Sequence, residues 1–412
     1  MSGPPPAKRR RPRSAEEPGD VAPPPSARVG GGDAEVDLVT CFNCGRSVPS
    51  GEYCGSCGAH LVSQSTSGAR RQHAFAADPG EHVLHLTFVS TLLPHLPHRS
   101  SLPFRIGFLV LGGLLVALGL VRLTGPAIAL ASVGVLVLYL LYLYEVEVYE
   151  DEPILVLAVT VLLGLILGAA WAYFTGPSIT QDRILNITLG PSAATVFVPG
   201  VLLPLLAQLL MLAGATVMYT RRHFDETLDG FSFGAACALG FTFGSTLVDL
   251  FPELQQGPFS NTPAVTNALQ IVQHGLLIPV INASTTGLIA GALWLRRGKV
   301  RAEARGLPTS LAVAIAVAVL VQAGRGVTSV LATSTLTEVL VYAVVALALL
   351  VWVRVALHHM LLAEAVEVPV GPPTECSHCH RIVPRMAFCP NCGIATRATP
   401  KTGAGRMARG VR

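Results

Sequence analysis

Eight of the nine cysteines form two groups with the same spacing, one toward each end of the 412-residue chain. In each group two C-x2-C pairs are separated by nine residues. Two thiolates two residues apart sit on one tight turn, and two such turns close a tetrahedron around Zn²⁺. The pattern predicts two structural zinc ions, one bound by Cys41, Cys44, Cys54 and Cys57 and one by Cys376, Cys379, Cys389 and Cys392.

Disulfide bonds are the alternative chemistry for these cysteines. A reducing compartment and the repetition of one close spacing both favour zinc. Gly45, Gly58 and Gly393 each follow a cysteine pair and allow the positive φ that such turns often need. A ribbon of about 20 residues has almost no core, so the metal supplies its folding free energy. Each ribbon is expected to fold on its own around a closed, non-catalytic site.

The central part of the chain is expected to lie in a membrane. Hydrophobic residues make up 51% of the sequence and charged residues only 13%. Between residues 106 and 357 the apolar residues form runs of about 20, the length of a helix that crosses the hydrocarbon core. We predict an all-α polytopic membrane helix bundle at 104–360 with two small β-type four-cysteine ribbons. The eight expected spans are 104–123, 126–144, 153–174, 194–220, 230–251, 265–295, 309–331 and 336–358.

An even number of spans places both ends of the chain on one side, and the loop charges indicate which side. Short cytosolic loops collect Lys and Arg. The two loops richest in these residues hold Arg221 and Arg222, and Arg296, Arg297, Lys299, Arg301 and Arg305. We therefore expect a multi-pass protein of the cell membrane with both termini in the cytosol.

The segments that flank the membrane domain differ in composition. Residues 1–36 are a Pro/Arg-rich tail expected to be disordered, and residues 396–412 form a similar basic tail. The ribbons are expected at 37–60 and 361–395. The linker 61–103 contains an apolar stretch too short to cross the bilayer, which could lie in the interface. The small net charge of +4 reflects the loop asymmetry, and no nucleic-acid partner is expected.

Three stretches of the membrane core resemble the PrsW family of intramembrane metalloproteases. The first is Tyr149 to Pro153, an acidic entry into an apolar span. The second runs from Phe224 through Asp225 and Glu226 to Gly230, and continues to Gly240-Phe241. The third is Pro279 to Asn282 with the following Thr285, Thr286 and Gly287. The resemblance implies a helical membrane domain and, in the family, a zinc protease site built from Glu and His residues.

This chain departs from the family at those ligand positions. The family pattern has a glutamate pair in the helix before the Phe224 loop, but the span 194–220 has no Asp, Glu or Lys. Ser245 replaces a glutamate, and Asn282 and Gln322 replace histidines. We expect these three to form a hydrogen-bonded cluster between helices. The remaining ionisable residues Asp249, His274 and Arg325 are expected to form a second intramembrane polar group.

The sequence therefore leaves three functions open. The favoured one is a non-catalytic PrsW relative that serves as a membrane scaffold or sensor, with ribbons that bind an unknown protein partner. The alternative is an active intramembrane metalloprotease with an atypical ligand set, which cleaves membrane-bound substrates. A transporter or channel is the third, but no inverted repeat supports it. Whether the protein is an enzyme is not decided by its sequence.

Overall fold

The computed structural model describes ten parts of the chain: 37–61, 102–146, 154–189, 192–221, 224, 227–256, 263–297, 307–331, 334–365 and 370–396. The predicted tails 1–36 and 396–412 and the linker 61–103 lie outside these parts, apart from residues 61, 102, 103 and 396. Asp225, Glu226 and the Tyr149 to Pro153 stretch also lie outside them.

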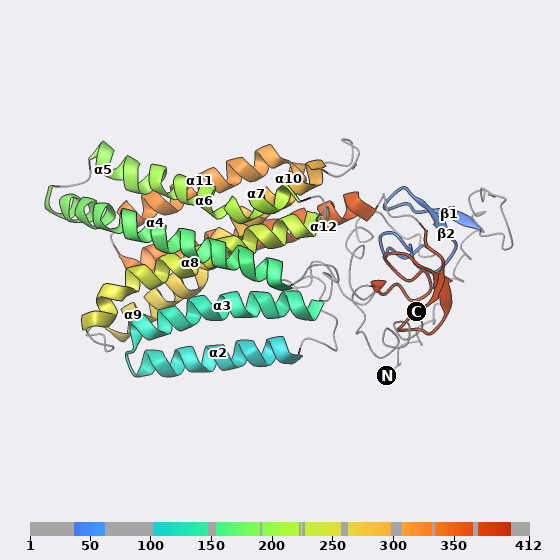
Figure 1. Ribbon diagram of the computed structural model, residues 1–412, viewed down its shortest axis with the longest axis horizontal. Helices are drawn as coiled ribbons and strands as arrows, with labels where there is room; N and C mark the ends of the chain where they lie inside the picture. The colour runs from blue at the N-terminus through green and yellow to red at the C-terminus, as the bar shows by residue number, and fades with distance from the viewer. Residues whose placement is uncertain are drawn as a thin grey trace, which may run out of the picture.

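A bundle of long helices fills most of the molecule (Figure 1). Six of the long segments are uninterrupted α-helices: α2 (Leu102–Leu120), α3 (Thr124–Val146), α4 (Ile154–Leu189), α8 (Thr227–Gln256), α11 (Leu311–Leu331) and α12 (Thr335–Ala365). Two further spans are built from consecutive pieces: α5 (Ala193–Phe197), η2 (Val198–Leu202), α6 (Leu203–Met211) and α7 (Ala213–Tyr219), and then α9 (Ala264–Val272), η3 (Gln273–Leu277) and α10 (Ile278–Arg297). A short 3-10 helix, η5 (Leu307–Thr309), precedes α11.

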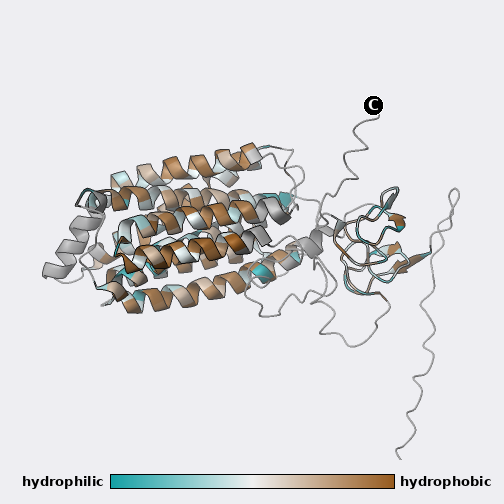
Figure 2. Cartoon of the chain, turned by 90° about the horizontal axis from the view of Figure 1, so that it is seen from below, coloured by the Kyte–Doolittle hydropathy of each residue, from teal (hydrophilic) through white to brown (hydrophobic). Residues whose placement is uncertain are grey.

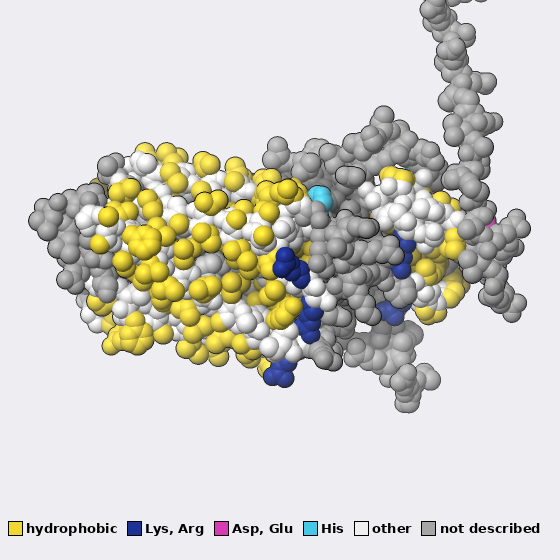
Figure 3. Space-filling model, turned by 90° about the horizontal axis from the view of Figure 1, so that it is seen from above, with side chains coloured by type: hydrophobic (Ala, Val, Ile, Leu, Met, Phe, Trp, Pro, Cys, Tyr) yellow, Lys and Arg dark blue, Asp and Glu magenta, His cyan; other side chains and the backbone are white. Residues whose placement is uncertain are grey.

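Seven of these helical segments are long and apolar enough to cross a membrane, counted over the described residues. The remaining expected span, 104–123, corresponds to α2, which has a shorter apolar stretch at 106–120. Apolar side chains cover the face of the bundle seen in Figure 3, and Figure 2 shows that most residues of the helices are hydrophobic. A helix in lipid must present hydrocarbon outward and satisfy its backbone internally. The chain is a multi-pass helical membrane protein in contact with the lipid bilayer, as the sequence predicts.

Helix α8 lies at the centre of the bundle and packs closely on α4. Gly164 and Gly168 of α4 face the α8 backbone at Cys237 and Phe241, where any Cβ would collide. Gly240 and Gly244 of α8 face the α4 backbone in the same way. Small residues on both helices let two backbones approach in the absence of a hydrophobic driving force between helices. Cys237 is fully buried in this contact, as expected for a small packing residue.

One end of the bundle is closed by aromatic and arginine contacts. The indole nitrogen of Trp294 donates to the carbonyl of Phe224 at 3.1 Å. The guanidinium of Arg297 donates to the carbonyl of Tyr219 at 2.6 Å and to that of Arg221 at 3.1 Å. The end of α10 is thereby fixed to the loop after α7. Figure 3 shows Lys and Arg side chains gathered at the end of the bundle that faces the ribbons.

Each ribbon begins with a two-stranded antiparallel sheet. In the first ribbon β1 (Leu38–Thr40) pairs with β2 (Ser47–Pro49), with Val39 opposite Val48. In the second, β3 (Pro373–Glu375) pairs with β4 (Ile382–Pro384), with Thr374 opposite Val383. Both ribbons lie beyond the same end of the bundle in Figures 1 and 2.

The two ribbons contact each other and share one small core. Met386 and Phe388 of the second ribbon are buried together with Val48 and Ala59 of the first, next to three of the first ribbon's cysteines. The sequence predicts two ribbons that fold separately, and the structure shows a pair. Spacing within each ribbon could not reveal this contact, because it joins segments more than 300 residues apart.

Candidate functional site

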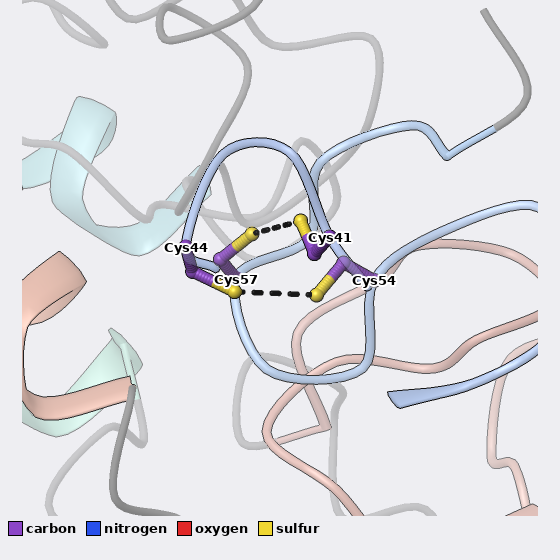
Figure 4. Close-up of side chains that lie close together, drawn as sticks. All are labelled: Cys41, Cys44, Cys54 and Cys57. Atoms are coloured by element: carbon purple, nitrogen blue, oxygen red, sulfur yellow. Dashed lines mark hydrogen bonds between the residues drawn. The ribbon is translucent and has the colours of Figure 1, made fainter. Parts of the chain in front are cut away.

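The first cysteine group forms a compact cluster of four sulfur atoms (Figure 4). The Sγ atoms of Cys41 and Cys57 are 3.7 Å apart, and those of Cys44 and Cys54 are 3.8 Å apart. In the second group the corresponding distances are 3.9 Å for Cys376 and Cys392 and 3.8 Å for Cys379 and Cys389. All eight cysteines are free. These separations are far longer than a disulfide bond of about 2.0 Å.

The sulfur spacing fits a tetrahedral ion. A metal with four ligands at about 2.3 Å, the usual Zn–S distance, separates its sulfurs by roughly 3.8 Å along each edge. Within each group all four sulfurs lie within 4.8 Å of one another. Among the residues that the structure describes, these are the groups of at least three Cys, His, Asp or Glu side chains able to share an ion. Each group can therefore hold one metal ion.

Tight turns after each cysteine pair aim the sulfurs inward. The backbone N–H of Gly45 donates to the carbonyl of Cys41 at 2.8 Å, and that of Gly58 donates to Cys54 at 2.8 Å. The turns that follow Cys376 and Cys389 close in the same way, at His380 and Gly393. All four closing residues have positive φ, with values of 71°, 72° and 72° for the glycines and 56° for His380. The predicted role of the three glycines is confirmed, and His380 takes the same conformation without being a glycine.

The thiols of the first group perturb one another strongly. The pKa of Cys41 is lowered because Cys44, Cys54 and Cys57 stabilise its thiolate through hydrogen bonds. The pKa of Cys57 is raised because the hydrogen bonds with Cys41, Cys44 and Cys54 favour its protonated form. Four crowded sulfurs cannot all ionise without a cation among them. A metal dication resolves this conflict because it takes all four as thiolates.

A second cluster of polar side chains lies inside the membrane bundle, where α6, α8, α10 and α11 meet. The amide nitrogen of Gln322 donates to Oε1 of Gln208 at 2.8 Å and to Oδ1 of Asn282 at 3.1 Å. Asn282 donates to Oγ1 of Thr242 at 2.8 Å. Thr285 donates to Oε1 of Gln208 at 3.0 Å. All five side chains are at most 5% exposed. The cluster is a continuous, uncharged hydrogen-bond network that joins four spans.

The structure brings together two of the three residues expected in this network. Asn282 and Gln322 contact each other, but the hydroxyl of Ser245 donates to the carbonyl of Thr242 at 3.0 Å within its own helix. Thr242, one turn earlier on α8, fills the place expected for Ser245. Gln208, Thr242 and Thr285 are the members that sequence reasoning missed. The signal for Gln208 was available, since it is the one amide in the apolar stretch 203–211.

The three residues of the expected second group come from three different elements. Asp249 on α8 and His274 in η3 are exposed on the outside of the bundle, and Arg325 on α11 is half-buried. Counting ionisable residues in spans does not reveal the helix face that each occupies, so this group stays a prediction.

Comparison with known proteins identifies the membrane domain. Residues 152–353 match the sequence model of the PrsW family, described as PrsW family intramembrane metalloprotease. No curated protein and no solved structure gives a match to the chain. The matched range covers the spans from α4 to most of α12, including every member of the buried polar cluster. Over residues 152–353 the membrane-spanning part of this chain is therefore similar to the PrsW family.

Proposed function

We propose that this protein is a non-catalytic member of the PrsW family, a membrane scaffold or sensor that holds two structural zinc ions in its ribbons. The observation that carries the proposal is the uncharged network centred on Gln322. It lies in the spans where the family resemblance places metal ligands, and Asn282 and Gln322 occupy two of those positions.

The donor chemistry of this network does not suit a hydrolytic metal. A catalytic zinc is held by three His, Glu, Asp or Cys ligands and leaves one position open for a water molecule. Amide and hydroxyl oxygens bring no negative charge to balance the dication. Within the network Gln208 donates to Thr286 at 2.9 Å and accepts from both Gln322 and Thr285. The buried Oε1 of Gln322 has no hydrogen-bond partner among the described residues, and one neutral amide oxygen is too few ligands for a metal ion. The network stabilises the bundle as it stands.

The ribbons supply the metal sites of the proposed protein. Cysteine thiolates in a tetrahedron are the preferred ligands of structural zinc, and such closed sites leave no position for substrate. The Arg side chains near the ribbon end of the bundle favour a cytosolic location for that end, with both chain termini there. The proposed division of the chain is a ribbon at 37–60, a membrane domain at 104–360 and a second ribbon at 361–395. Because α12 continues to Ala365, we move the boundary between the last two to that residue. In this position the ribbon surfaces are available to a cytosolic protein partner.

The family match also supports a second function, an active intramembrane metalloprotease with an atypical ligand set. The two functions differ in the metal content of the membrane domain and can be separated on the full-length chain. We would purify the protein and a variant in which all eight ribbon cysteines are replaced by Ser, reconstitute both in lipid nanodiscs, and measure bound zinc and cleavage of a panel of single-span substrates.

The proposal predicts two zinc ions per wild-type chain, with sulfur neighbours at about 2.3 Å in X-ray absorption. It predicts no zinc in the variant without ribbon cysteines and no cleavage by either protein. General acid-base catalysis and metal activation of water each raise the rate of hydrolysis by orders of magnitude. The loss of both therefore removes detectable turnover. Zinc retained by the variant without ribbon cysteines, together with cleavage that a chelator abolishes, would establish the protease instead.

A further inference from the structure

The two ribbons are joined by a reciprocal pair of backbone hydrogen bonds. The N–H of Tyr53 donates to the carbonyl of Pro390 at 2.9 Å, and the N–H of Phe388 donates to the carbonyl of Gly55 at 2.8 Å. Tyr53 and Gly55 flank Cys54, the third cysteine of its group, and Phe388 and Pro390 flank Cys389, the third cysteine of the other. Equivalent positions of the two ribbons therefore exchange equivalent bonds, as in a two-fold symmetric interface.

Side chains of the second ribbon fill space that glycines leave open in the first. A Cβ on Gly55 would collide with the thioether of Met386, and a Cβ on Gly58 would lie 2.8 Å from the ring of Phe388. Met386 and Phe388 are 5% and 6% exposed. Burial of two such side chains contributes favourable free energy to ribbon pairing.

The glycine at position 55 is specific to this contact. Three other residues in the chain follow the first cysteine of a C-x2-C pair: Phe42, Ser377 and Pro390. Phe42 is 45% exposed and Ser377 is also exposed, so that position in a turn does not itself require a glycine. At Gly55 the requirement comes from the partner ribbon.

We infer that the two ribbons form one two-zinc unit in which each metal site depends on the other. This inference rests on the proposed zinc ligation. A ribbon without its metal has almost no core and unfolds. Unfolding of one ribbon removes the two interface hydrogen bonds and exposes Met386, Phe388 or the surface they cover. Metal loss at one end of the chain thus weakens metal binding at the other and separates the two ends.

Zinc release from the full-length protein in nanodiscs tests the coupling. A colorimetric chelator in excess reports the release of each ion over time. The Gly55→Leu variant places a side chain in the position of Met386, so we expect both zinc ions to leave at least tenfold faster than from the wild type. The matched control is Ser377→Leu, the same position in an exposed turn, which should release both ions at the wild-type rate. One fast ion and one ion at the wild-type rate would show that Gly55→Leu damages only its own ribbon, and would overturn the coupling.

Cross-linking tests the pairing itself without reference to metal. Photo-methionine has nearly the same shape as methionine and can be incorporated in its place. At position 386 it should form a cross-link, within one chain, to the peptide that contains Gly55. The cross-link should be lost in Gly55→Leu and kept in Ser377→Leu. A wild-type chain that binds two zinc ions but gives no such cross-link, or gives it only between two copies, would overturn the inference and leave the proposed function standing. A cross-linked chain without zinc would instead contradict the proposed zinc sites.

Discussion

His380 is the exception among the four residues that close the cysteine turns. The other three are glycines, for which a positive φ has no steric cost. For a residue with a Cβ the left-handed conformation costs roughly 1–2 kcal/mol. His380 recovers little of this, because its contact with Glu375 at 3.2 Å lies between two exposed side chains. The second ribbon is therefore strained at one residue where the first is not.

Replacing His380 with Gly should relieve this strain. The gain is partly offset because Gly also increases the entropy of the unfolded ribbon. We expect net stabilisation of about 0.5–1 kcal/mol, which corresponds to roughly a two- to fivefold increase in zinc affinity. Competition titration with a chelator measures this change. The converse control is Gly45→Ala, where a Cβ meets no neighbour within 4 Å, so that only the backbone conformation is affected. If Gly45→Ala weakens zinc binding but His380→Gly does not strengthen it, the side chain of His380 itself stabilises the second ribbon and the strain explanation is wrong.

Residue types predicted part of the buried polar cluster. Asn282 and Gln322 were recognised because an amide in an apolar span must find a hydrogen-bond partner. Thr242 was not, because threonine can satisfy its hydroxyl on the preceding turn of its own helix, as it does here with the carbonyl of Ala238 at 2.8 Å. Its acceptance of a bond from Asn282 depends on how α8 and α10 are rotated against each other. That rotation is a property of packing and is not encoded in the residue types alone.

At the scale of helices, the close approach of α4 and α8 organises the bundle. Four glycines on the two helices face the opposite backbone, so the distance between the helix axes is set by backbone contact. Helix α8 also carries Gly234 against the backbone carbonyl of Thr286 on α10. The central position of α8 thus follows from glycines on more than one of its faces.

A single added methyl group should disturb this contact. In Gly168→Ala the new Cβ would collide with the backbone of Phe241, which no side-chain rotation can relieve, so the helices must separate. We expect a loss of about 1–3 kcal/mol in stability. Unfolding by denaturing detergent in lipid bicelles measures it. Gly176→Ala on the same helix is the control, because its Cβ meets nothing within 4 Å, and it should match the wild type or exceed it slightly. Equal stability of the two variants would show that α4 and α8 do not touch as described.

Hydropathy predicted the positions of the helices and, with the shorter apolar stretch in α2 as the exception, their ability to span a membrane. It did not predict the irregular shape of two of them. The expected spans 194–220 and 265–295 contain the π-helical turns η2 and η3. Gly200 in η2 packs against α11, where a Cβ on Gly326 would collide with its carbonyl. Such turns often occur where a helix adapts to a neighbour. A window average of hydropathy is blind to this, because π-helical and α-helical segments are equally apolar.

For the whole molecule, the proposed orientation can be tested with two exposed residues at opposite ends of the bundle. Val265 at the start of α9 and Leu307 in η5 are each 72% exposed. In whole cells Val265→Cys should react with a membrane-impermeant thiol reagent, and Leu307→Cys should react only after the membrane is opened. The unmodified protein serves as the background, because its ribbon cysteines would be shielded in the cytosol. Labelling of Leu307→Cys alone on intact cells would place the ribbons outside, where disulfides become the expected chemistry.

The contact between the ribbons also changes the connectivity of the molecule. Residues near 54 are held to residues near 389, so that the intervening spans form a ring closed by noncovalent contacts between the ribbons. In an unfolded chain, closing a loop of this length costs roughly 6 kcal/mol of free energy through lost entropy. The folded bundle already places both ends of the loop on one side, so most of this entropy is lost when the bundle folds and little more when the ribbons pair. Ribbon pairing in turn limits the distance by which the first and last spans can separate in the plane of the bilayer. A cut in any single loop of the ring would leave two fragments that still travel together.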